Sequence, residues 1–116
     1  TSPEALKTEQ LVDVPLVESV RNYAKLAQAA GLAGVVCSAH EAADIASVTG
    51  PNFLRVTPGI RPAGSAVGDQ SRVATPGNAA SMGSSAIVVG RPITKADDPV
   101  AAYHAIRDDW NAGRKA

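Results

Sequence analysis

Two arginines of this chain each precede a proline and follow closely on a glycine. Arg61 lies in GIRP at residues 59–62, and Arg91 lies in GRP at residues 90–92. A guanidinium is a planar fork of N–H donors that fits a phosphate, and a glycine lets the backbone approach a ligand closely. The pattern predicts phosphate binding, in which the Arg91 guanidinium and the backbone N–H groups of Gly90 and Arg91 point at the anion. The alternative for Arg91 is an ordinary surface arginine after a strand.

Two short apolar runs are expected to position these arginines. Residues 53–56 and 86–89 have the composition of buried strands, and a helix is expected between them. Both strand ends would then lie side by side on one rim of a parallel sheet. In a (β/α)8 barrel, the phosphate site is usually formed there, by the loops after the last two strands.

The rest of the chain alternates between helical and strand patterns. Strands are predicted at 34–37, 53–56 and 86–89, and helices at 3–10, 15–30, 40–48 and 76–82, with a last helix from Pro99 to a frayed tail at 113–116. The expected helix N-caps are Ser2, Thr75 and Asp98, and a further turn of helix is expected at 92–94.

This order favours the α/β class with parallel strands and right-handed crossovers. The strands recur at roughly the interval of a (β/α)8 barrel unit, but the pattern contains three strands where a barrel has eight. A parallel sheet has to be covered on both faces, and an arc of three strands would expose its inner face. We therefore predict an incomplete barrel, which needs strands from another polypeptide or from preceding sequence.

Composition narrows the classes of function. The chain has 11 basic and 11 acidic residues, so its charge favours neither nucleic acid nor an anionic membrane surface as a partner. Cys37 is its single cysteine, which argues against a disulfide framework and a cysteine metal cluster. The sequence contains neither a membrane-spanning apolar run nor a recognisable signal peptide, so a cytoplasmic setting is expected.

Three segments together resemble the orotidine 5′-phosphate decarboxylase family. They are VTPGIRPAG at 56–64, GDQSRVATP at 68–76 and VVGRPITKADDP at 88–99. The resemblance covers the whole chain, and implies that residues 1–116 are the C-terminal portion of a single (β/α)8 barrel domain, with its last three strands and their helices. It also implies conversion of orotidine 5′-phosphate to UMP in pyrimidine synthesis, without a metal or organic cofactor, by a homodimer.

The resemblance assigns binding roles to further residues. Thr1 corresponds to a threonine that hydrogen-bonds the pyrimidine edge, and Arg61 to a position at the ligand phosphate. Gln70, in the long loop 58–74, corresponds to a glutamine that reaches over the ligand and touches both phosphate and base. The alternatives are a disordered terminus for Thr1, a salt-bridged loop residue for Arg61 and a solvated side chain for Gln70.

The family's catalytic lysines and aspartates lie in a motif of the form D-x-K-x-x-D, which this sequence lacks. We therefore expect no catalytic residue in this chain, and an N-terminal half of the same enzyme as its partner. One alternative is a sugar-phosphate decarboxylase or aldolase of the same superfamily, although such enzymes lack the pattern of the 58–74 loop. The other is a half barrel that binds a phosphorylated ligand or a partner chain without catalysis.

Overall fold

The computed structural model describes residues 2–8, 14–63 and 74–115. The elements in chain order are α1 (Pro3–Thr8), α2 (Leu16–Ala29), β1 (Gly34–Val36), α3 (Ala39–Thr49), β2 (Leu54–Thr57), α4 (Pro76–Met82), β3 (Ala86–Ile87), α5 (Arg91–Thr94) and α6 (Pro99–Arg114). The predicted order of helices and strands is confirmed within these residues. The expected helix at 3–10 extends in part beyond them.

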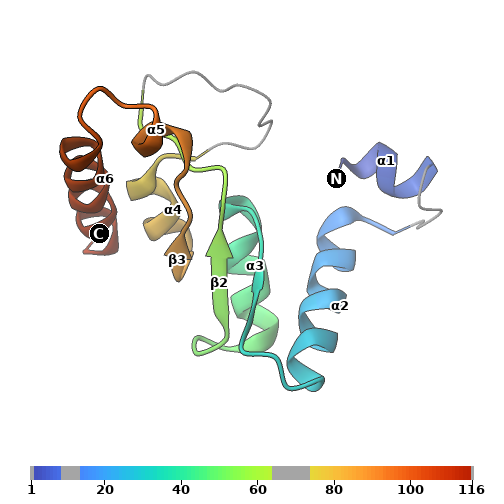
Figure 1. Ribbon diagram of the computed structural model, residues 1–116. Helices are drawn as coiled ribbons and strands as arrows, with labels where there is room; N and C mark the ends of the chain where they lie inside the picture. The colour runs from blue at the N-terminus through green and yellow to red at the C-terminus, as the bar shows by residue number, and fades with distance from the viewer. Residues whose placement is uncertain (1, 9–13, 64–73, 116) are drawn as a thin grey trace.

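The three strands form one parallel sheet in the order β1-β2-β3, as the alternating pattern predicts (Figure 1). Val36 pairs with Val56, and Val56 pairs with Ala86. Backbone hydrogen bonds continue the sheet past the ends of β1 and β3, from Cys37 N to Val56 O at 2.9 Å and from Val88 N to Thr57 O at 2.9 Å. The C-terminal ends of β2 and β3 are thereby held side by side.

The two faces of this sheet differ sharply in burial. Helices α3 and α4 lie behind the strands in Figure 1, and on that face Phe53, Arg55 and Thr57 are 5%, 9% and 1% exposed. On the opposite face Val36 is 74% exposed and Leu54 is 49% exposed. The expectation of fully buried strands is wrong for this face, because no described element covers it. The expectation that a three-strand arc exposes its inner face is confirmed.

Local signals at the helix ends account for most boundaries. The side chains of Thr75 and Asp98 accept hydrogen bonds from Asn78 N at 3.2 Å and Ala101 N at 3.1 Å, so both predicted N-caps are confirmed. The Ser2 hydroxyl accepts from Ala5 N at 3.1 Å. The predicted end of the last helix is wrong, since α6 continues through Gly113 to Arg114 instead of fraying. The predicted end of the last strand is also wrong, since β3 ends at Ile87 and not at residue 89.

Helix α6 keeps its last turn because it packs closely against α4. A Cβ atom added at Gly113 would overlap the backbone of Gly77, so the two helices approach each other at a pair of glycines. Side-chain periodicity does not report such a contact, because glycine carries no apolar signal.

Replacing Gly113 with alanine should therefore destabilise the fold by about 1–3 kcal/mol, because the helices have to move apart. Helix propensity alone predicts the opposite sign, a gain of up to about 1 kcal/mol. Urea unfolding of the variant decides between these signs. Asn111→Ala, at an exposed position of the same helix, is the control and should change stability little.

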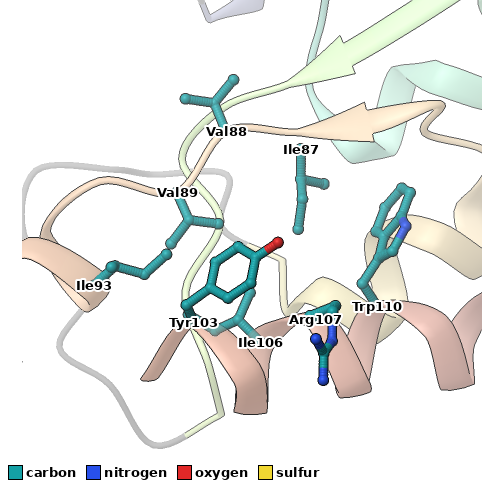
Figure 2. Close-up of a pocket in the computed structure, with 8 residues that line it drawn as sticks. All are labelled: Ile87, Val88, Val89, Ile93, Tyr103, Ile106, Arg107 and Trp110. Carbon is teal, nitrogen blue, oxygen red and sulfur yellow. The ribbon is translucent and has the colours of Figure 1, made fainter. Parts of the chain in front are cut away.

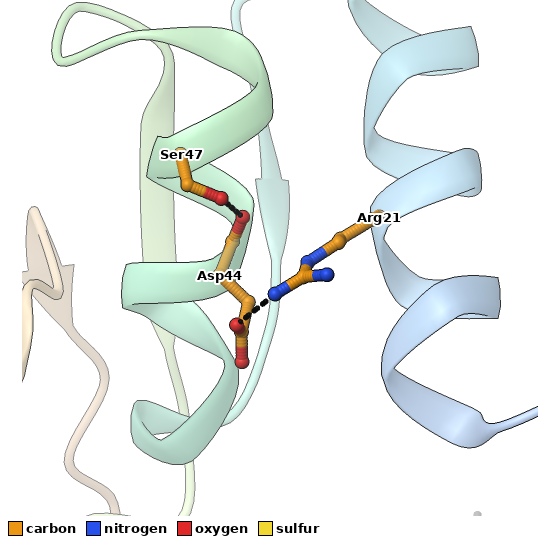
Figure 3. A network of polar contacts seen from close by, with 3 residues as sticks. All are labelled: Arg21, Asp44 and Ser47. Carbon is orange, nitrogen blue, oxygen red and sulfur yellow. Dashed lines mark hydrogen bonds and ion pairs between the residues drawn. The ribbon is translucent and has the colours of Figure 1, made fainter.

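A polar link joins α2 and α3 beside the edge strand β1 (Figure 3). Arg21 of α2 donates to Asp44 of α3 at 2.7 Å, and the Gln28 side chain donates to Thr49 O at 2.7 Å. The side chains of Arg21 and Asp44 are 41% and 35% exposed, so their ion pair contributes on the order of 1 kcal/mol or less. Its main effect is to fix the orientation of α2 against α3.

A buried arginine ties β2 to the end of α4. The Arg55 side chain donates to Gly83 O and to Phe53 O, both at 2.7 Å. The sequence pattern treats Arg55 as one member of an apolar strand and misses this role. None of the helices in the described ranges is long and apolar enough to cross a membrane.

Candidate phosphate-binding site

The residues that directly follow β2 and β3 line an open cavity of about 230 Å³. The residues that line it come from both glycine–arginine segments: Pro58, Gly59, Ile60, Arg61, Val88, Gly90, Arg91 and Pro92. Arg61 and Arg91 lie thirty positions apart in the sequence, and the parallel pairing of β2 with β3 brings their segments together. The predicted meeting of the two strand endings is thus present in the structure.

Backbone geometry fixes the position of Arg61. The chain turns at Gly59, whose φ of +72° lies in the left-handed region that favours glycine. Ile60, which is 2% exposed, forms a parallel bridge with Ala74, and Arg61 N donates to Ala74 O at 3.1 Å. The segment that carries Arg61 is therefore anchored to Ala74 directly before the arginine's Cα.

The side chain of Arg61 has a donor without a partner among the residues that the structure describes. Its Nε atom is buried and makes no hydrogen bond with any of them. A buried donor on a charged group is costly to leave unpaired, and buried polar groups nearly always have a partner. An anion in the neighbouring cavity would provide the missing acceptor.

The second segment leaves room for a ligand at Gly90. A Cβ atom added at Gly90 would meet nothing within 4 Å among the described residues, so packing in this part of the chain does not account for a glycine there. Arg91 begins α5, and the N–H groups of Ile93 and Thr94 both donate to Gly90 O at 3.0 Å. This confirms the predicted turn of helix after the glycine, and it presents an exposed Arg91 beside the cavity.

The structure does not describe the two remaining candidate binding residues. Thr1 and Gln70 lie outside the described residues, so their predicted contacts remain predictions. In the part of the chain that the structure describes, no three side chains of His, Cys, Asp or Glu lie together as a possible metal site.

Cys37 is buried at the end of β1, as expected of a small strand residue. Burial raises the pKa of its thiol above the ordinary value, and the carboxylate of Glu41 acts in the same direction. The thiol is therefore kept protonated at neutral pH, which makes Cys37 a poor nucleophile.

Two apolar grooves flank the sheet, one at each edge strand. The groove beside β3 has a volume of about 440 Å³, and Figure 2 shows Ile87 of β3 and Val89 just after it facing Tyr103 and Ile106 of α6 across it. The groove beside β1 has a volume of about 330 Å³ and lies between that strand and α2. Tyr103 is 52% exposed at the open groove beside β3.

A parallel α/β sheet whose last two strands are followed by glycine–arginine segments around one cavity defines the class: part of a (β/α)8 barrel protein. Comparison with known proteins makes the assignment specific. Residues 1–106 match the family described as "Orotidine 5'-phosphate decarboxylase / HUMPS family", and the chain belongs to this family.

Individual relatives agree with this assignment. The chain is 58% identical over 112 residues to orotidine 5′-phosphate decarboxylase of Streptococcus uberis, and the match covers 97% of this chain and 49% of that protein. The crystal structure of orotidine 5′-phosphate decarboxylase from Lactobacillus acidophilus matches with a TM-score of 0.79 at 47% identity, over 96% of this chain and 45% of that one. An uncharacterized conserved protein from Geobacillus kaustophilus has the same TM-score at 40% identity, over 96% of this chain and 44% of that one. The chain spans about half the length of these relatives.

Proposed function

We propose that this chain provides the phosphate-binding part of an orotidine 5′-phosphate decarboxylase, which forms UMP in pyrimidine synthesis. One observation carries the proposal: Arg61 and Arg91 border the same cavity, where a buried guanidinium nitrogen of Arg61 has no hydrogen-bond partner within the described ranges. The names of the relatives support orotidine 5′-phosphate as the ligand. The pattern of the 58–74 loop supports it against the sugar phosphates of the superfamily.

The proposed phosphate-binding groups, called the phosphate grip below, affect the reaction rate although they do not touch the reacting carbon. Arg61, Arg91 and the backbone at Gly90 hold the phosphate, while Gln70 and Thr1 are assigned to the base side of the ligand on their sequence pattern alone. Binding energy from a part of the substrate that does not react can be used for orientation and closure at the reacting carbon. Truncating this grip should therefore lower kcat as well as raise KM.

The lysines and aspartates that act on the carboxylate are proposed to come from the rest of the barrel. Residues 1–116 then form the C-terminal portion of one barrel domain. The exposed inner face at Leu54 and the apolar grooves beside β1 and β3 support this, because these are the surfaces that further strands and helices would cover. We also propose that the complete enzyme is a cytoplasmic homodimer.

Ligand affinity tests the proposed grip. In the enzyme formed by this chain and the rest of its barrel, UMP should bind at least about 100-fold more tightly than uridine, because uridine offers the arginines no anion. Competition binding measures both constants. Equal affinities would contradict the proposal. Tighter binding of a pentose phosphate than of UMP would instead favour the sugar-phosphate members of the superfamily.

A further inference from the structure

A small cavity lies on the α6 side of the candidate site and touches both arginine segments. Its volume is about 130 Å³, and three prolines line it together with residues of α6. Pro62 follows Arg61 directly, Pro92 follows Arg91 directly, and Pro76 begins α4. Helix α6 therefore backs the two loops that carry the proposed phosphate ligands.

Asp109 is the charged residue of α6 at this cavity. Its Oδ2 atom accepts a hydrogen bond from the backbone N–H of Gly77 at 3.0 Å. Gly77 is the second residue of α4, where helix N–H groups lack partners within the helix and a negative charge is stabilising. The fit is close, because a Cβ atom added at Gly77 would lie 2.7 Å from Asp109 Oδ1.

The contact at Gly77 leads to Arg61 by a short series of bonds. Thr75 caps α4, and its neighbour Ala74 accepts the hydrogen bond from Arg61 N at 3.1 Å. Ala74 and Ile60 are 8% and 2% exposed and belong to one buried cluster, against which Trp110 of α6 packs. The start of α4 and the Arg61 segment are thus joined by both hydrogen bonds and packing.

We propose that Asp109 is a positioning residue for the phosphate grip. It fixes the start of α4 against α6, and through Ala74 it sets where the Arg61 guanidinium lies relative to Arg91. Asp109 does not line the candidate site itself, so it acts through Arg61 and not on the ligand. This inference rests on the proposed function.

The test compares UMP and uridine binding in the enzyme formed by this chain and the rest of its barrel. Asp109→Ala should weaken UMP binding about tenfold, which corresponds to about 1.4 kcal/mol, and leave uridine binding unchanged. Asp109→Asn keeps an oxygen acceptor for Gly77 N–H and should restore most of the lost UMP affinity. Asp108→Ala is the matched control, because the neighbouring Asp108 is 70% exposed and pairs with Arg107 on its own helix.

The outcomes separate this inference from the function on which it rests. If Asp109→Ala lowers the affinities for UMP and uridine equally, or lowers the melting temperature alone, Asp109 supports the fold only and the inference is overturned. If Asp109→Asn binds UMP as poorly as Asp109→Ala, the hydrogen bond to Gly77 is not the cause and the inference also fails. If the unmodified enzyme itself does not prefer UMP over uridine, the proposed function falls first.

Discussion

Replacing Arg91 with alanine should lower kcat/KM for orotidine 5′-phosphate by about 100-fold or more in the complete enzyme. A bidentate arginine–phosphate pair in a site closed from water is among the stronger polar contacts in proteins, and 100-fold corresponds to about 2.7 kcal/mol. The effect should appear in kcat as well as KM, because remote binding energy assists the chemical step. Steady-state kinetics on the purified variant measure both constants.

Two further variants sharpen this test. Arg91→Lys keeps the positive charge but loses the planar fork, so it should recover only part of the lost activity. Arg114→Ala removes an exposed arginine at the end of α6 and should leave kcat/KM unchanged. If Arg91→Ala had the kinetics of Arg114→Ala, Arg91 would not be a phosphate ligand.

Replacing Leu54 with aspartate should abolish association of this chain with the rest of its barrel, and with it the activity. Leu54 lies on β2, the central strand, and points to the sheet face that no described element covers. Burying an unpaired carboxylate against apolar side chains costs several kcal/mol. Because Leu54 is 49% exposed in the present structure, the same change should cost the chain by itself far less.

Co-purification of the two portions of the barrel, expressed as separate chains for this purpose, followed by a turnover assay, measures this loss. The matched control is Ala43→Asp, which places the same charge on the exposed side of α3. The control should leave both association and turnover intact. Full activity of the Leu54→Asp enzyme would show that the exposed sheet face is not an assembly surface.

Much of the architecture follows from local signals in the sequence. The caps at Thr75 and Asp98, the glycine after α4 and the short apolar runs each determine structure within a few residues of themselves. The meeting of Arg61 with Arg91 also follows, because the ends of neighbouring parallel strands share one rim of a sheet. Neither step requires knowledge of the rest of the protein.

Other features depend on packing between distant segments, which periodicity does not encode. Tyr103 and Ile106 belong to one apolar stripe of α6, yet Tyr103 is 52% exposed and Ile106 is 6% exposed. The stripe indicates which side of a helix is apolar, but not which described element covers each turn. The contact between Asp109 and Gly77, and the role of Arg55 in the sheet, likewise require the helices to be placed first.

Turnover of orotidine 5′-phosphate by the complete enzyme that contains these 116 residues tests the central claim most directly. The loss of the substrate's ultraviolet absorbance follows the reaction continuously. We predict decarboxylation that depends on Arg91 and stops when Leu54→Asp separates the halves. An intact, assembled enzyme that left orotidine 5′-phosphate unchanged while acting on a sugar phosphate would contradict the account.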